Sequence, residues 1–273
     1  MPLPDLSLGW LSLPQASPLE LISAAAGAGF SSVSLRIAAD PGDPEPALAS
    51  DPQMVRQVKA ALSDTGIFLA EMGSIRMHGP RPSDWCLPSL EAGASLGAHT
   101  LIALIFEPNA HKRLEDFCDL CQAASVFGLR VAIEFALFSA VPTLEDAQAL
   151  ALASGMANAG IAVDALHLAR SGGQPANLHR AAPELIFLAQ LCDAPAVGPT
   201  DLAGLRQEAR QHRLDPGCGD LPLVDFVLAL PAYFPLELEV PCSLTAALSP
   251  AQRAKQIAER SRDFLSERGI YSD

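Results

Sequence analysis

Residues 130–165 read RVAIEFALFSAVPTLEDAQALALASGMANAGIAVDA and contain one complete strand–helix–strand unit. The runs Arg130–Phe135 and Ile161–Ala165 are almost continuously apolar, which is typical of strands buried on both faces of a parallel sheet. Between them, Thr143-Leu-Glu-Asp146 predicts the capped start of a helix that ends near Gly160. The unit therefore predicts two parallel strands joined by a helical crossover.

The same alternation extends from this unit to both ends of the chain. Six further apolar runs predict strands at Leu6–Leu11, Ser32–Ile37, Ile67–Met72, Thr100–Phe106, Leu185–Leu191 and Leu236–Val240. Segments with Ser, Asp or Pro starts and Gly stops predict the other helices, at Ser17–Ala28, Asp51–Gly66, Ser83–Gly97, Lys112–Phe127, Asn177–Ala182, Leu223–Leu230 and Ser249–Arg268. Eight alternations predict an α/β fold with a single (β/α)8 TIM barrel. An open doubly wound sheet would usually carry a glycine-rich turn after its first strand, and none follows Leu6–Leu11.

Length and composition agree with one barrel domain over residues 1–273. Hydrophobic residues make up 49% of the chain and aromatic residues only 5%, so the core is expected to be aliphatic. The two longest connections, Ala38–Ser50 and Cys192–Leu221, follow predicted strands and so leave their carboxyl ends. Barrel active sites are built from such loops.

The net charge and the cysteine pattern indicate which kinds of partner and which cellular compartment to expect. A net charge of −13 disfavours nucleic acid as a partner, because the phosphate backbone would be repelled. No apolar run of roughly 18 residues predicts a membrane span, and the N-terminus does not resemble a signal peptide. We therefore expect a cytoplasmic enzyme without a membrane partner, whose six cysteines are reduced. Cys118 and Cys121 form a C-x-x-C inside a predicted helix, which favours packing over zinc binding.

Polar side chains end four consecutive apolar runs in the second half of the chain. These residues are Glu134, Asp164, Gln190 and Glu239. The carboxyl ends of neighbouring parallel strands meet at one mouth of a barrel, so we expect the four side chains to converge. Three carboxylates at one place repel one another unless a cation lies between them, which predicts a divalent metal site. The alternative is that each residue separately caps a helix or binds a loop.

Other polar residues follow the strands of the first half and are expected to face the same mouth. Arg36 ends the second predicted strand, while Glu71 and Arg76 follow at the end of the third. An arginine here could hold a phosphate or carboxylate of a substrate through two parallel hydrogen bonds. A salt bridge within a loop is the alternative for each of them.

The second half of the chain contains five short motifs in a fixed order. They are Val131-Ala-Ile-Glu134, Val163-Asp-Ala-Leu-His167, Gln190-Leu-Cys-Asp193, Arg213-Leu-Asp-Pro-Gly-Cys-Gly219 and Leu236-Glu-Leu-Glu239. In this order and spacing, they resemble the xylose-isomerase-like barrels. This family includes sugar isomerases, ketose 3-epimerases, inosose dehydratases and 3-dehydroshikimate dehydratases, and it is related to a class of DNA-repair endonucleases.

The resemblance implies roles for individual residues. Glu134, Asp164, Gln190 and Glu239 match the family's four metal ligands, and the two glutamates match its acid and base. His167 and Arg213 match residues that contact substrate oxygens. Gln190 departs from the histidine that most sugar isomerases and epimerases of the family carry, and is similar to the glutamine of some dehydroshikimate dehydratases. An amide oxygen suits Mn²⁺, Mg²⁺ or Co²⁺ better than zinc.

Four functions remain open on these grounds. The first is a metal-dependent isomerase or epimerase that acts through an enediolate on a small hydroxy-ketone or polyol-like substrate. The second is a dehydratase, a lyase, acting on 3-dehydroshikimate or a keto-inositol. A DNA endonuclease is disfavoured by 6 histidines and the acidic charge, and a non-catalytic binding protein is the fourth. Barrels of this family often pair, so we expect a homodimer.

Overall fold

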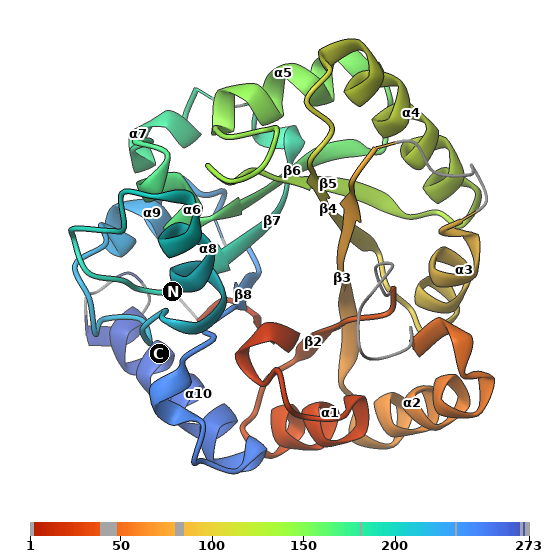
Figure 1. The fold of residues 1–273 in the computed structure, drawn as a ribbon. Coiled ribbons are helices and arrows are strands. Elements are labelled where there is room, and N and C mark those ends of the chain that lie inside the picture. The colour runs from red at the N-terminus through yellow and green to blue at the C-terminus, as the bar shows by residue number, and fades with distance from the viewer. Residues whose placement is uncertain are drawn as a thin grey trace.

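Eight parallel strands close into one barrel in sequence order, with β1 beside β8, as predicted (Figure 1). The computed structural model describes residues 3–38, 48–79, 85–180, 182–232, 234–267 and 270. The strands are β1 (Leu6–Leu8), β2 (Ser32–Leu35), β3 (Phe68–Met77), β4 (Thr100–Ile105), β5 (Arg130–Glu134), β6 (Ala159–Asp164), β7 (Ile186–Leu191) and β8 (Leu236–Leu238).

Helices surround this barrel on its outside (Figure 1). They are α1 (Pro18–Gly27), α2 (Pro52–Thr65), α3 (Leu87–Ser95), α4 (Ala110–Val126), α5 (Leu144–Ser154), α6 (Ala165–Arg170), α7 (Pro175–Leu178), α8 (Leu202–Gln211), α9 (Leu223–Ala229) and α10 (Pro250–Glu267). Short 3-10 turns are formed by Trp10–Ser12, Leu48–Ser50, Pro183–Leu185 and Ser243–Thr245. None of the described helices is both long and apolar enough to cross a membrane.

Local signals explain where the longer helices start and stop. The hydroxyl of Thr143 accepts a hydrogen bond from the backbone N–H of Asp146, which caps α5 as predicted. This helix ends at Ser154 and not near Gly160, because Gly155 takes a left-handed φ of 62°. The predicted start of α3 at Ser83 lies outside the described residues, and α3 is described from Leu87.

Two predictions for the second half need correction. The predicted helix at 177–182 is a single turn, α7, at Pro175–Leu178, and an unpredicted helix, α6, directly follows β6. The region expected to be a loop at 192–221 contains α8, which begins after Asp201. The side chain of Asp201 accepts the N–H groups of Ala203 and Gly204, so a capped helix begins there.

The core is aliphatic, and polar groups enter it mainly inside the barrel. Nearly all buried hydrophobic residues are Ala, Val, Leu and Ile, in keeping with the composition. The buried polar side chains inside the barrel include Ser7, Ser34, Glu71, Gln190 and Glu237. Cys121 lies in the core as a free thiol, and Cys118 beside it is also free. The polar side chains beneath the mouth of the barrel are therefore the part of the core that is described further below.

Candidate active site

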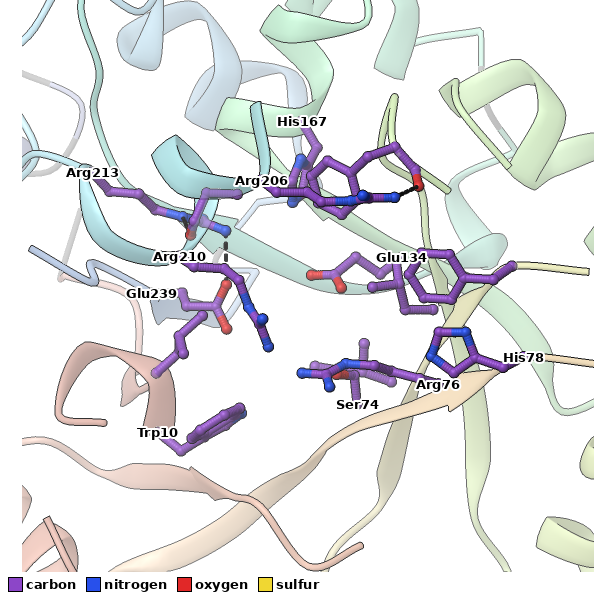
Figure 2. Close-up of a pocket in the computed structure, with 16 residues that line it drawn as sticks. Trp10, Ser74, Arg76, His78, Glu134, His167, Arg206, Arg210, Arg213 and Glu239 are labelled. Atoms are coloured by element: carbon purple, nitrogen blue, oxygen red, sulfur yellow. Dashed lines mark hydrogen bonds and ion pairs between the residues drawn. The ribbon is translucent and has the colours of Figure 1, made fainter. Parts of the chain in front are cut away.

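A cavity of about 410 Å³ opens at the carboxyl ends of the strands (Figure 2). Glu134 and Glu239 line it, from β5 and from just beyond β8. Its apolar wall is formed by Trp10, Leu11, Ile102, Leu104, Phe106 and Phe138. The cavity therefore joins two acidic groups to a surface that can pack against a carbon skeleton.

Both glutamates are buried, and burial disturbs their ionisation. Burial raises the pKa of Glu134 to about 7, and repulsion from Asp164 adds to the rise. Burial also raises the pKa of Glu239 well above its ordinary range, although Arg213 opposes the shift. A carboxyl group with a pKa near neutrality can both give and take a proton, as a general acid–base requires.

Arg213 joins two of the predicted ligands in one ion-pair network. Its Nη1 pairs with Asp164 and its Nη2 lies 3.0 Å from Oε2 of Glu239, while its Nε donates to the Ala209 carbonyl. Burial is the largest influence and would raise the pKa of Asp164, but the attraction of Arg213 and the hydrogen bonds from Arg213 and His167 together hold that pKa below its ordinary value. When Glu134, Asp164 and Glu239 are all ionised, these three carboxylates and the guanidinium carry a formal charge of −2.

His167 lies one helical turn after Asp164. The other oxygen of Asp164, Oδ1, accepts the backbone N–H of His167 at 2.9 Å and so caps α6. The imidazole lines the cavity with its edge against Phe138, at a centroid distance of 5.6 Å. Burial lowers the pKa of His167 to about 4, so its ring is neutral at physiological pH. A neutral imidazole can donate one hydrogen bond to a substrate oxygen.

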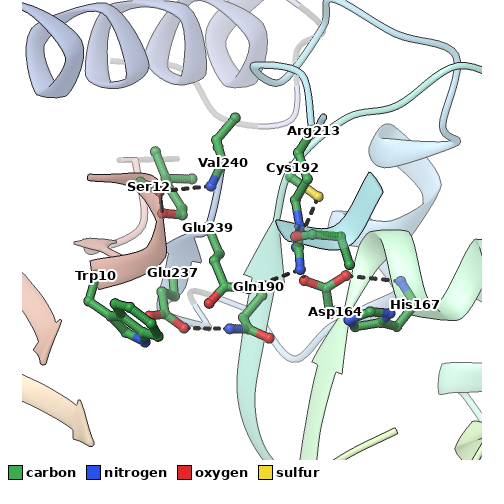
Figure 3. A network of polar contacts seen from close by, with 12 residues as sticks. Trp10, Ser12, Asp164, His167, Gln190, Cys192, Arg213, Glu237, Glu239 and Val240 are labelled. Atoms are coloured by element: carbon green, nitrogen blue, oxygen red, sulfur yellow. Dashed lines mark hydrogen bonds and ion pairs between the residues drawn. The ribbon is translucent and has the colours of Figure 1, made fainter. Parts of the chain in front are cut away.

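Gln190 sits on β7 between Asp164 and Glu237 in the strand register. Its Nε2 donates to Oε2 of Glu237 at 2.9 Å, which fixes the orientation of the amide (Figure 3). Its Oε1 is buried without a hydrogen-bond partner. A buried unpaired oxygen costs free energy, so an additional group at this position would be stabilising.

The donor set suits a hard divalent cation in chemistry and in charge. Three carboxylates and an amide oxygen are the ligands that Mg²⁺ and Mn²⁺ prefer, and the −2 of this group balances one such ion. In the part of the chain that the structure describes, however, no three His, Cys, Asp or Glu side chains have the spacing of a metal site. Arg213 occupies an oxygen of Asp164 and of Glu239, so metal binding would have to displace part of this contact.

The loop that carries Arg213 is anchored by Asp193, which sequence reasoning quoted in a motif without giving it a role. The buried carboxylate accepts the backbone N–H groups of Ala194, Gly217, Gly219 and Leu221 at 2.8 to 3.0 Å. A Cβ on Gly219 would lie 2.4 Å from the Ala194 carbonyl oxygen, so only glycine fits there. Asp193 therefore fixes the segment that returns Arg213 to the mouth.

Two predicted substrate contacts do not line the cavity. Arg36 lies over the ring of Trp10, with its Cζ 5.8 Å from the centroid, and borders a neighbouring hollow. Glu71 is buried inside the barrel, where the Ser7 hydroxyl donates to it at 3.4 Å. Burial and the charge of Glu237 raise the pKa of Glu71 well above its ordinary value.

Several residues that do line the cavity were not selected from the sequence. Arg206 and Arg210 project from α8, and Trp10 and Phe138 come from turns after β1 and β5. A sequence signal for both arginines does exist. Asp201 can cap a helix, and Arg206 and Arg210 follow it four residues apart, a spacing that places both side chains on one face of that helix.

Comparisons with known proteins agree with the barrel. The structure of the IolI protein with a bound zinc atom superposes with a TM-score of 0.77 at 16% identity, over 96% of this chain and 98% of that one. D-psicose 3-epimerase with D-tagatose from Clostridium cellulolyticum H10 superposes at 0.73 and 14% identity, over 96% and 99%. At these identities the likeness shows the fold alone.

Sequence comparison adds a relative and a family. A 3-dehydroshikimate dehydratase of Pseudomonas aeruginosa is 33% identical over 130 residues, which span 46% of this chain and only 20% of that protein. The family model described as xylose isomerase-like TIM barrel matches residues 22–268. Since that match includes nearly the whole barrel, the chain belongs to the xylose isomerase-like TIM barrel family.

Proposed function

We propose that this protein is a divalent-metal-dependent enzyme that enolises a hydroxy-ketone, as an isomerase or epimerase does. The observation that carries the proposal is a cavity lined by Glu134 and Glu239, where Arg213 joins Glu239 to Asp164 and where Oε1 of the nearby Gln190 is buried and unpartnered. A buried amide oxygen without a hydrogen bond costs free energy, so a cation bound to it would be stabilising.

These four side chains would hold the metal, which we propose to be Mn²⁺, Mg²⁺ or Co²⁺. When bound, such an ion polarises a carbonyl and so acidifies the proton on the neighbouring carbon. Gln190 contributes an uncharged oxygen, kept in place because its amide nitrogen donates to Glu237. Asp164 serves as a ligand only, since Arg213 lowers its pKa and keeps it ionised.

Glu134 and Glu239 move the proton in this proposal. They border the cavity from β5 and β8, and each has a pKa raised by burial. One takes the proton from the substrate carbon, and the other returns it to the neighbouring carbon or to the opposite face of the same carbon. His167 and Arg213 donate hydrogen bonds to the substrate oxygens, and the apolar wall excludes water.

Deuterium exchange tests enolisation without requiring the net reaction to be known. The Mn²⁺-loaded protein is incubated in D₂O with D-fructose, D-psicose, a keto-inositol or 3-dehydroshikimate, and proton NMR follows the carbon-bound hydrogen beside the ketone. Exchange with at least one ketone, lost in Glu134→Gln and Glu239→Gln and kept in the exposed control Glu259→Gln, supports the proposal. Absence of exchange with all four overturns it for these substrate types.

A dehydratase is the second candidate, favoured by the partial likeness to a 3-dehydroshikimate dehydratase. The first proton transfer is the same, and loss of a β-hydroxyl as water then replaces reprotonation. Incubation of the Mn²⁺-loaded protein with 3-dehydroshikimate, followed by the absorbance of protocatechuate, separates the two. Exchange without protocatechuate favours the isomerase or epimerase.

A further inference from the structure

The buried side chain of Arg253 connects two segments that carry residues of the candidate site. Arg253 lies near the start of α10 and is 3% exposed. Its Nη1 donates to Oδ1 of Asp215 at 2.6 Å, and its Nη2 donates to the Val240 carbonyl at 2.9 Å. Asp215 comes two residues after Arg213, and Val240 directly follows Glu239. One guanidinium is therefore bonded to the chain next to both members of the ion pair at the mouth.

The segment that carries Glu239 lies beyond the last strand, since β8 ends at Leu238. Its position therefore depends on contacts outside the strand ladder. The hydroxyl of Ser12 accepts the backbone N–H of Val240 at 2.7 Å and donates to the Leu238 carbonyl at 2.8 Å (Figure 3). Arg253 holds the carbonyl of Val240, so the N–H and the C=O of the residue next to Glu239 are both bonded.

The segment after Arg213 is tied to α10 through the buried carboxylate of Asp215. While Arg253 holds Oδ1, the other oxygen accepts Nε2 of Gln256 at 2.9 Å and lies 3.5 Å from Nε of Arg260. Three side chains of α10 thus converge on Asp215. In the part of the chain that the structure describes, Arg253 is the one among them that also bonds to the segment after β8.

This connection depends on the forked shape of the guanidinium. The Nε of Arg253 is buried without an acceptor among the described residues, so its two Nη groups make the contacts with Asp215 and Val240. A guanidinium is planar and rigid, and it holds two acceptors at a fixed spacing. A lysine ammonium is a compact charge on a flexible stem, so it would keep the charge without fixing that spacing.

We propose that Arg253 is a positioning residue, which sets the contact of 3.0 Å between Nη2 of Arg213 and Oε2 of Glu239. Arg253 does not line the cavity, so it acts through the two segments that it joins. Its effect on the geometry rests on the contacts above, whereas its effect on metal binding and proton transfer rests on the proposed function. A carboxylate that turns away from its productive orientation loses much of its value as a ligand and as an acid–base group.

Amide hydrogen exchange in the metal-free protein tests the geometry without metal or substrate. The N–H of Val240 donates to Ser12, and the N–H of Arg213 donates to the Pro241 carbonyl at 3.0 Å, so these two amides report on the two segments. Arg253→Lys keeps the buried positive charge, which guards against unfolding. In this variant both amides should exchange about tenfold faster or more, as followed by NMR. Unchanged exchange at either amide overturns the proposal.

Arg262→Lys is the matched control, because Arg262 lies on the same helix and also donates from both Nη groups to backbone. Its acceptors are the carbonyls of Ala28 and Gly29, which precede β2 at the opposite end of the barrel from the mouth. The control should loosen the contact between α10 and α1 and leave the exchange of both reporter amides unchanged. Equal acceleration of these amides in Arg253→Lys and Arg262→Lys would mean a general loosening of α10, which overturns the positioning role.

Manganese binding tests the consequence for the site. Arg253→Lys should bind Mn²⁺ about tenfold more weakly by calorimetry. At saturating Mn²⁺ the electron paramagnetic resonance spectrum of its bound ion should also differ from that of the original protein. A loss of stability alone would leave the spectrum of the folded, saturated protein unchanged, as Arg262→Lys should show. Unchanged affinity and spectrum in Arg253→Lys overturn the role at the site. If the original protein binds no Mn²⁺, the proposed function fails, and the two amides still decide whether Arg253 sets the geometry.

Discussion

The amide nitrogen of Gln190 donates to Oε2 of Glu237 at 2.9 Å, inside the barrel and beneath the mouth (Figure 3). This contact decides which end of the amide faces the cluster of carboxylates, because a carboxylate accepts from the nitrogen and repels the oxygen. Glu237 thus acts as a positioning residue for Gln190. Its own burial, which raises its pKa, is partly offset by hydrogen bonds from Ser34 and Gln190.

Removal of the acceptor on Glu237 should weaken metal binding. Glu237→Leu keeps the volume of the side chain but leaves the Gln190 amide free to turn, and we expect the affinity for Mn²⁺ to fall by about 10- to 100-fold. Isothermal titration calorimetry measures this directly. Glu237→Gln retains an oxygen that can accept from Gln190 and should stay close to the original protein. An equal loss in both variants would mean that the charge of Glu237, and not its acceptor, is required.

Replacement of Gln190 by histidine should change the metal preference. An imidazole on β7 could donate one N–H to Glu237 and offer its other nitrogen to the metal, an arrangement that suits zinc. We expect Gln190→His to raise the ratio of Zn²⁺ to Mn²⁺ affinity at least tenfold, as measured by competition with a metal-binding dye. Gln190→Asn, which keeps an amide on a shorter side chain, controls for a general loss of packing. A ratio unchanged in the histidine variant would show that residue 190 does not touch the ion.

The positions of Glu134, Asp164, Gln190 and Glu239 near strand ends could be predicted because a polar residue in such an apolar run has few other places to lie. Parallel strands buried on both faces are apolar, so a carboxylate or amide near the carboxyl end of such a run points to the shared mouth. Glu134 ends β5 and Asp164 ends β6, as the apolar runs predicted. The contacts among these groups could not be predicted, because Arg213 reaches them from a loop whose path depends on Asp193.

Depth along a strand was harder to predict than the face of the strand. Glu71 was expected near the end of its strand, but β3 continues to Met77 and leaves Glu71 inside the barrel beside Ser7. The alternation of side chains along a strand determines on which face of the sheet a residue lies, whereas the depth of that residue in the barrel depends on where the strand ends. Similarly, the sequence predicts a loop where α8 lies, because Pro, Gly and Asp residues on both sides of this helix are typical of loops. Arg206 and Arg210 were therefore not recognised as residues that line the cavity.

Ionisation of Glu134 should make the stability of the metal-free protein depend on pH. Its pKa is raised from 4.5 to about 7, so the folded state binds this proton more tightly than the unfolded state does. The stabilisation is fully present below about pH 4.5 and is lost as the pH rises through about 7, a change of about 3 kcal/mol.

Comparison with Glu134→Gln isolates this contribution from those of the other buried carboxylates. The variant cannot ionise at this position, so it should gain stability relative to the original protein between pH 5 and about pH 8. Urea unfolding of both metal-depleted proteins at several pH values provides the difference in free energy. Parallel pH profiles would contradict the raised pKa of Glu134.

Loss of the Asp193 carboxylate should destabilise the loop that brings Arg213 to the mouth. Asp193 is buried and accepts three N–H groups from the segment between Gly217 and Leu221, and its backbone pairs with Leu214 next to Arg213. Asp193→Ala leaves these donors without an acceptor, which should lower the free energy of unfolding by about 3 kcal/mol.

The loss should be local before it is global, since the strands do not depend on these hydrogen bonds. Limited proteolysis should therefore cut residues 214–221 in Asp193→Ala at temperatures where the barrel remains folded by circular dichroism. Asp193→Asn keeps one acceptor oxygen but places an amide nitrogen against backbone N–H groups. Its stability should therefore lie between that of the original protein and that of Asp193→Ala. If Asp193→Ala resists cleavage as well as the original protein does, the path of the loop is fixed by the remaining contacts of Arg213 with Asp164 and Glu239, and the anchoring role of Asp193 is refuted.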